Sequence, residues 1–226
     1  YDFIHSDADE QPAPTANEPE EQPAPWFRLF RYRQTWSFTL GKFMTDGVWW
    51  FFLFWLPSYL KSSYGMSTEQ MMLPLAVLYS MTMVGSIGGG YLPALFDKNG
   101  RDPYKSRMMA MFTIALFPLI VLLAQPLSNI SYWFPVLLIG IGASAHQAWS
   151  ANIYTTVSDM FPKKAVGSIV GIGTMAGGLS GVVTSKAGGY LFDYFEGLGH
   201  IETGYTIMFC FCAVAYILAW CVMKLL

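Results

Sequence analysis

The sequence predicts an all-α membrane protein with six transmembrane helices, on the basis of three observations. Of its 226 residues, 54% are hydrophobic and 12% are charged, so the chain is more apolar and less charged than an average soluble domain. Six apolar segments are each long enough to cross about 30 Å of hydrocarbon as a helix. The basic residues gather in the loops on one side of these segments, as they do in membrane proteins of fixed orientation.

Residues 1–35 differ from the rest of the chain. Residues 1–25 hold seven of the fifteen acidic residues, five prolines and no Lys or Arg. Such a segment buries too little apolar surface to fold alone, so we predict a disordered, acidic, cytoplasmic linker. The segment has neither an initiating Met nor a signal peptide. We therefore expect the sequence to be the later part of a longer protein. Residues 26–35 alternate aromatic and basic side chains and are predicted to lie at the membrane interface.

The six predicted spans are residues 36–60, 71–96, 108–124, 132–155, 166–190 and 205–223. When the loops are assigned alternately to two sides, ten Lys and Arg residues fall on one side and Lys61 alone on the other. Because basic loops remain in the cytoplasm, both ends of the chain are predicted to be cytoplasmic, with the spans in the cell membrane. The basic residues are thus explained by the orientation of the helices in the membrane. We expect the lipid bilayer as a partner, and we expect no nucleic acid.

The first span carries two charges, Lys42 and Asp46, one helical turn apart on the same face. Charges at mid-membrane cost at least about 2.5 to 3.5 kcal/mol each, so they tend to pair or to face water. Two interpretations remain open: a self-neutralising pair that locks helix packing, or the wall of a hydrated cavity whose Lys attracts an anion. Trp49 shares this arc and joins the candidate binding site in the second interpretation.

The fourth span has one polar face. At 100° per residue, four polar side chains fall within about 100° of arc: His146, Gln147, Ser150 and Tyr154. Trp149 lies about 60° to the other side of His146, so this helix can present both polar and aromatic groups to a ligand. On the fifth span, Thr174 is the polar mid-membrane group of a small-residue face predicted to pack on a neighbouring helix, with Gly167, Gly171, Gly178, Gly181 and Ser185.

The sequence offers nothing that resembles a nucleophile with its base, a phosphate loop or a zinc motif. His146 is the one His within the predicted spans, so a catalytic dyad or a metal cluster has no partner there. We therefore predict a protein that is not an enzyme and that has no cofactor and no metal site.

Three stretches carry a resemblance to a known family. The run Asp97-Lys98-Asn99-Gly100-Arg101, shortly after Gly89, resembles the cytoplasmic signature loop of the major facilitator superfamily. More specific are Thr45 to Trp50 with Phe54 to Pro57, and His146 to Asn152 running into Ser158 to Ser168. These blocks resemble the hexuronate transporters of the anion:cation symporter branch.

The resemblance implies the C-terminal half of a twelve-helix major facilitator fold, built as an inverted repeat of three plus three helices. It places the spans 36–60 and 132–155 at the central cavity and 71–96 and 166–190 against the other half. It also implies a gating loop at Asp97, Gly100 and Arg101. The implied function is secondary active transport of a sugar acid such as glucuronate or galacturonate by alternating access. Protons are the expected coupling ion, and an N-terminal six-helix half is the expected partner.

The candidate substrate-binding residues come from three spans. They are Lys42, Asp46, Trp49, His146, Gln147, Trp149, Ser150, Tyr154 and Thr174. Two alternatives to the transporter half remain open. A six-helix membrane enzyme would need a second catalytic group near His146, and a self-sufficient half-transporter or channel would act as a homodimer through its glycine faces.

Overall fold

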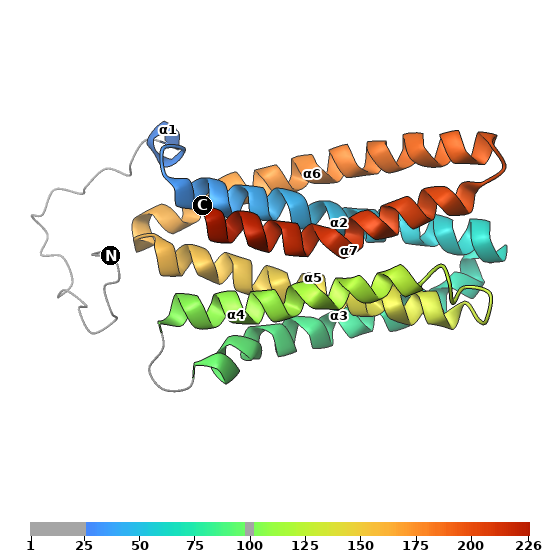
Figure 1. Ribbon diagram of the computed structural model, residues 1–226, viewed down its shortest axis with the longest axis horizontal. Coiled ribbons are helices and arrows are strands. Elements are labelled where there is room, and N and C mark those ends of the chain that lie inside the picture. Colours follow the sequence, from blue (N-terminus) through green and yellow to red (C-terminus); the bar gives the residue numbers. More distant parts are fainter. Residues whose placement is uncertain (1–25, 98–101) are drawn as a thin grey trace, which may run out of the picture.

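The computed structural model describes residues 26–97 and 102–226, so the predicted linker and the loop residues Gly100 and Arg101 lie outside the described residues. The described chain is a bundle of long helices without a strand, which confirms the all-α prediction (Figure 1). The elements are α1 (Trp26–Leu29), α2 (Arg33–Tyr64), α3 (Thr68–Phe96), α4 (Pro103–Leu116), the 3-10 helix η2 (Phe117–Leu123), α5 (Trp133–Met160), α6 (Lys163–Gly197) and α7 (Ile201–Leu225).

The helix boundaries follow from local chemistry. Ser67 and Gln70 form a reciprocal capping box at the start of α3, and the Asp102 carboxylate accepts a hydrogen bond from the Tyr104 amide at the start of α4. The third predicted span changes from α-helix to 3-10 helix at Phe117, next to Pro118, which lacks an amide hydrogen for the α-helical ladder.

Four helical segments of the described chain are long and apolar enough to cross a membrane: α3, α4 with η2, α6 and α7. The helices α2 and α5 have 32 and 28 residues, which is long enough, but they carry the charged and polar groups that lower their hydropathy. These two helices, with the most polar mid-sections, are the two that the family resemblance implies at a central cavity.

The basic loops meet at one end of the bundle. There α2, α4 and α6 begin, and α3, α5 and α7 finish (Figure 1). We call this the basic end, because it carries Arg33, Lys105, Arg107, Lys163, Lys164 and Lys224, whereas Lys61 lies at the opposite end. The alternation assumed from the sequence thus agrees with the direction of each helix.

The α3–α5 contact is built on small residues at four-residue spacing. A Cβ atom added at Gly85 would meet the backbone of Ser144, and one added at Gly89 would meet Ala148. The Asn152 side-chain amide then donates to the Gly89 carbonyl at 2.7 Å. Because lipid gives helices no hydrophobic reason to associate, this close backbone approach supplies the dispersion contacts that hold the pair together.

In the α2–α6 contact, large α2 side chains pack directly against glycines of α6. The three pairs are Gly173 with Phe38, Gly177 with Asp46, and Gly181 with Trp50. Gly167 and Gly178 also belong to the predicted packing face of α6, but no atom of the described chain lies near the position of an added Cβ there. In the described chain, those two glycines lie on an open side of α6 that also exposes Thr174.

We predict that Gly85→Ala destabilises the protein while Gly90→Ala does not. The added methyl at position 85 has to displace α5 backbone, which costs about 1 to 3 kcal/mol as overpacking. Position 90 is open, and Ala in place of a helical Gly gains up to about 1 kcal/mol there. Thermal unfolding of the two purified variants in detergent measures the difference, and equal melting temperatures would contradict the packing argument.

Candidate functional site

The first cluster surrounds the ammonium group of Lys42, on α2. Its Nζ lies 2.8 Å from Asp46 Oδ2, and the two side chains are 3% and 14% exposed. The same Nζ lies 4.4 Å from the centre of the Tyr154 ring on α5, a cation–π distance. The pair therefore forms inside the bundle, and an aromatic face covers the cation.

The cluster continues onto α6. The Tyr154 hydroxyl lies 3.4 Å from Thr174 Oγ1, and either group can donate the hydrogen bond. Asp46 Oδ1 is buried without a hydrogen-bond partner among the described residues. Four of the candidate binding residues, Lys42, Asp46, Tyr154 and Thr174, thus lie in one cluster, and one carboxylate oxygen in it has no hydrogen-bond partner among the described residues.

The second cluster centres on His146, at the middle of α5. Its ring stacks on Trp49 of α2, with centroids 5.1 Å apart and planes at 14°. His146 Nδ1 lies 2.8 Å from the hydroxyl of Tyr216 on α7, and that hydroxyl lies 3.5 Å from the Thr45 carbonyl. Seven residues separate Lys42 from Trp49, so the two clusters are stacked about 10 Å apart along α2.

Tyr216, in the sixth span, was missed by the sequence analysis, which took candidate residues from the first, fourth and fifth spans. The ring is fully buried, and its hydroxyl bonds His146. A phenol in the middle of an apolar span is the signal that could have found it, because a buried tyrosine hydroxyl usually finds a polar partner.

The remaining predicted residues of α5 are placed differently. Gln147 and Ser150 are half-buried on the side of α5 that also carries Tyr154. Trp149 is fully buried and packs edge-on against Tyr216, with ring centroids 5.5 Å apart. The half-exposed side of α5 therefore contains hydrogen-bonding groups, and Trp49 is the candidate ring surface beside it.

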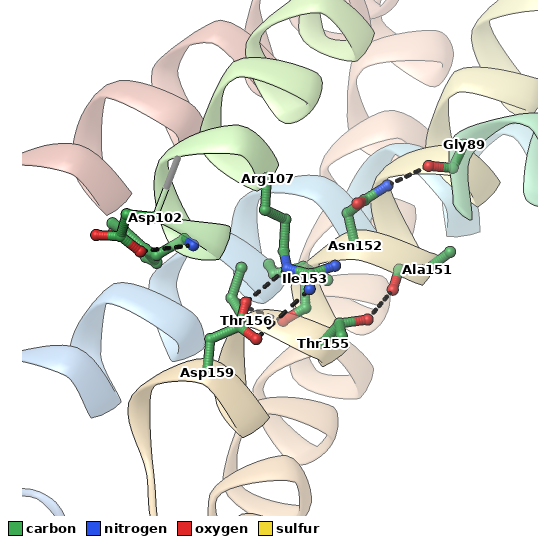
Figure 2. Close-up of polar contacts among 10 residues, drawn as sticks. Gly89, Asp102, Arg107, Ala151, Asn152, Ile153, Thr155, Thr156 and Asp159 are labelled. Atoms are coloured by element: carbon green, nitrogen blue, oxygen red, sulfur yellow. Dashed lines mark hydrogen bonds and ion pairs between the residues drawn. The ribbon is translucent and has the colours of Figure 1, made fainter. Parts of the chain in front are cut away.

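A third polar group lies at the basic end and was not predicted. Arg107 of α4 binds Asp159 of α5 through Nε to Oδ2 at 2.6 Å and Nη2 to Oδ1 at 3.5 Å (Figure 2). Figure 2 also shows Asn152, two turns earlier on α5, directed at Gly89 of α3. These two contacts fix the last turns of α5 between α3 and α4. Asp97, which the family resemblance implies to be a gating residue, is the C-cap of α3 and donates its amide hydrogen to the Pro93 carbonyl.

Long apolar helices with buried polar groups at mid-length define a multi-pass membrane protein. The Major Facilitator Superfamily matches residues 4–185, more than half of the chain, and the chain belongs to that superfamily.

Several curated relatives are named as transporters of sugar acids. The chain is 28% identical to the hexuronate transporter of Escherichia coli K12 over 171 residues, which cover 74% of this chain and 38% of that protein. It is 34% identical to a probable L-galactonate transporter of the same strain over 102 residues, covering 43% and 22%. It is 26% identical to that strain's probable galactarate/D-glucarate transporter over 151 residues, covering 67% and 33%. The chain thus spans about two fifths of the length of the hexuronate transporter.

We predict that Tyr216→Phe destabilises the protein because it leaves the buried His146 ring without its hydrogen-bond partner. Removing one member of a buried hydrogen bond costs about 1 to 3 kcal/mol. Tyr190→Phe is the matched control, since Tyr190 lies on α6 and is 75% exposed. Thermal unfolding of both variants is the measurement. A Tyr216→Phe protein that melts with the control would show that this bond adds no stability.

Proposed function

We propose that this chain is the C-terminal six-helix half of a secondary transporter that moves a sugar acid together with protons by alternating access. The observation that carries the proposal is the buried Lys42 ammonium, held beside half-exposed hydrogen-bonding groups on the two most polar helices. Superfamily membership and the names of the relatives support transport and the class of substrate.

An inverted three-plus-three repeat is supported by the way the helices pair. The repeat would exchange α2 with α5, α3 with α6, and α4–η2 with α7. Under this exchange the extensive α2–α6 contact becomes the extensive α5–α3 contact. Likewise α2–α7 maps onto α5 with α4 and η2, and α3–α4 maps onto α6–α7. Every substantial pairing of the described helices therefore has a counterpart or maps onto itself.

A second half is supported by the distribution of exposed apolar side chains. Buried residues make up 22% and 33% of the apolar stretches of α3 and α6, against 44% for α4–η2 and for α7. The exposed large side chains of α3 and α6 include Met83, Val84, Ile87, Met175, Leu179 and Val183. We propose that the N-terminal half covers this side, so that the half-exposed groups of α2 and α5 face a cavity between the halves.

The two clusters provide the groups that a polyhydroxy carboxylate needs. Lys42 supplies a cation for the carboxylate, and Trp49 supplies a flat surface for the sugar ring. Hydrogen-bond partners for the hydroxyls come from Gln147, Ser150 and Thr174, which retain exposed surface. His146 holds Trp49 in place through stacking while Tyr216 holds His146, and the predicted contact of Trp149 would require its ring to leave Tyr216.

The basic end is proposed to face the cytoplasm, with the bundle in the cell membrane and residues 26–35 at its interface. Asp97, together with Gly100 and Arg101 of the adjoining loop, would form the gate that is closed while the cavity opens outward. We propose that, while the gate is closed, the Asp97 carboxylate binds amide groups at the start of a helix, an interaction worth roughly 0.3 to 1 kcal/mol.

A homodimer of this six-helix unit is the second candidate function, favoured by the same open side of α3 and α6. Cross-linking between single Cys residues placed on α6 of two copies would support it. The twelve-helix proposal expects no such cross-link and expects one to a first half encoded in the same gene.

We predict that Gln147→Ala raises the KM for uptake roughly ten- to a hundredfold without reducing the amount of protein in the membrane. The reason is that loss of one contact to a buried polar ligand costs about 1 to 3 kcal/mol. Gln34→Ala is the control, since Gln34 is exposed at the basic end. Radiolabelled glucuronate and galactonate uptake by cells gives the measurement. Normal uptake by a His146→Ala, Gln147→Ala double variant would remove this site from the proposal.

We predict that Lys42→Gln abolishes anion binding and that adding Asp46→Asn does not restore it. A pair that only locks helix packing would behave in the opposite way, because removing both charges restores neutrality and rescues the single variant. Binding of glucuronate to the purified variants, with melting temperature measured in parallel, distinguishes the two. Full rescue by the double variant would make Lys42 structural.

A further inference from the structure

The carboxylate of Asp46 is held by a single charged partner. Oδ2 binds Lys42 Nζ at 2.8 Å, and Oδ1 is buried without a partner among the described residues. On α6 the carboxylate lies against Gly177, where a Cβ atom would collide with Oδ2. Most buried carboxylates accept several hydrogen bonds, so this one depends unusually strongly on one ammonium group.

The neighbouring helices add no second cation at this level of the described chain. From α5, Tyr154 presents its ring to Lys42 and its hydroxyl to Thr174, and His146 lies in the next layer, where its Nδ1 is engaged by Tyr216 of α7. From α6 the group faces Gly177 and Thr174, which are not titratable. Lys42 and Asp46 are therefore the two charges of the cluster, and together they are neutral.

A substrate carboxylate at Lys42 would disturb this balance. One ammonium group would then face two carboxylates within a few ångströms, in a place where net charge is costly. Lys42 Nζ has three hydrogens, and its partners are one carboxylate oxygen and one aromatic face, so a hydrogen remains for a substrate carboxylate. One positive charge cannot balance two carboxylates, so the new anion weakens the bond to Asp46 unless one carboxylate is neutralised.

We propose that Asp46 is the proton-binding residue of this half of the transporter, and that it takes up one proton when a carboxylate substrate replaces it on Lys42. This inference rests on the proposed function. The proton comes from water on the side to which the cavity is open and forms an O–H bond on Asp46, while Lys42 keeps all its protons. On release of the anion, Asp46 returns its proton to water and rebinds Lys42.

The exchange keeps the cluster neutral in both states. The empty state contains an ammonium and one carboxylate, and the loaded state contains an ammonium, the substrate carboxylate and a neutral carboxylic acid. An anion bound without a proton would leave one uncompensated negative charge at membrane depth, and a proton bound without an anion would leave one positive charge. Both partly loaded states are therefore disfavoured, which links the anion and the proton in one step.

The test is the number of protons taken up when glucuronate binds to the purified full-length protein. Calorimetry in buffers of different ionisation enthalpy gives this number. We expect the uptake for the wild type to exceed that for Asp46→Asn by one proton per anion, with glucuronate affinity for the variant unchanged or higher. Glu202→Gln is the matched control, because that carboxylate is exposed in the first turn of α7 and should keep the wild-type value.

Equal proton uptake by the wild type and Asp46→Asn would overturn the inference while leaving the transporter proposal intact. If the wild type binds none of glucuronate, galactonate and glucarate and transports none of them, the proposed function itself fails, and the inference fails with it. Retained concentrative uptake driven by a proton gradient in Asp46→Asn proteoliposomes would also overturn the inference.

If Asp46→Asn does not fold, infrared difference spectra of the folded wild type carry the test. Addition of glucuronate should produce the carbonyl band of a protonated carboxylic acid. In Gly177→Ala the added methyl meets the Asp46 carboxylate, so the frequency of that band should shift. Absence of the band in the wild type, or an unchanged frequency in Gly177→Ala, would exclude Asp46 as the group that is protonated.

Discussion

The structure depends on the close approach of two helix pairs, α3 with α5 and α2 with α6. In lipid the apolar side chains of a helix gain little by moving from acyl chains to protein, so packing has to come from dispersion at short range and from interhelical polar contacts. Glycine makes that range possible at Gly85 and Gly89, where α5 backbone fills the space that a side chain would take. It makes room for a charged side chain at Gly177, where the space is filled by the Asp46 carboxylate. Glycine therefore lets two backbones approach in one helix pair and admits a carboxylate between the helices of the other.

The two polar clusters are contacted by different helices. Lys42 is held from α5 and α6 through Tyr154 and its link to Thr174, and His146 is held from α7 through Tyr216. Lys42 and His146 thus each have a partner on another helix, which limits the cost of their burial. Asp46 Oδ1 has no hydrogen-bond partner among the described residues, and among the buried atoms in that situation it is the one that belongs to a charged group, for which the cost of burial is highest.

Sequence reasoning predicted what depends on local pattern and missed what depends on which helices meet. The helix positions follow from runs of apolar residues, and the change at Pro118 follows from its missing amide hydrogen. The Lys42–Asp46 pair was predictable because both residues are on one helix, four positions apart. The Arg107–Asp159 pair and the Tyr216–His146 bond join residues 52 and 70 positions apart, and no periodicity connects them. For the same reason the sequence could identify glycine-rich faces on α6 without indicating which of them contacts α2.

The open side of the bundle is the strongest physical argument that another protein surface lies against it. The helices α3 and α6 expose the most apolar surface, although they flank α2 and α5, which carry the charged and polar residues (Figure 1). If lipid covered that side, acyl chains would meet Gln147, Ser150 and Thr174 as well as Met83 and Leu179, and each unsatisfied polar group would cost several kcal/mol, on the order of 2 to 7. A second protein body resting on the apolar edges of α3 and α6 would instead enclose the polar groups in a water-filled space. The apolar edges and the polar centre would then be two parts of one arrangement, in which the edges seal a cavity whose wall is made by α2 and α5.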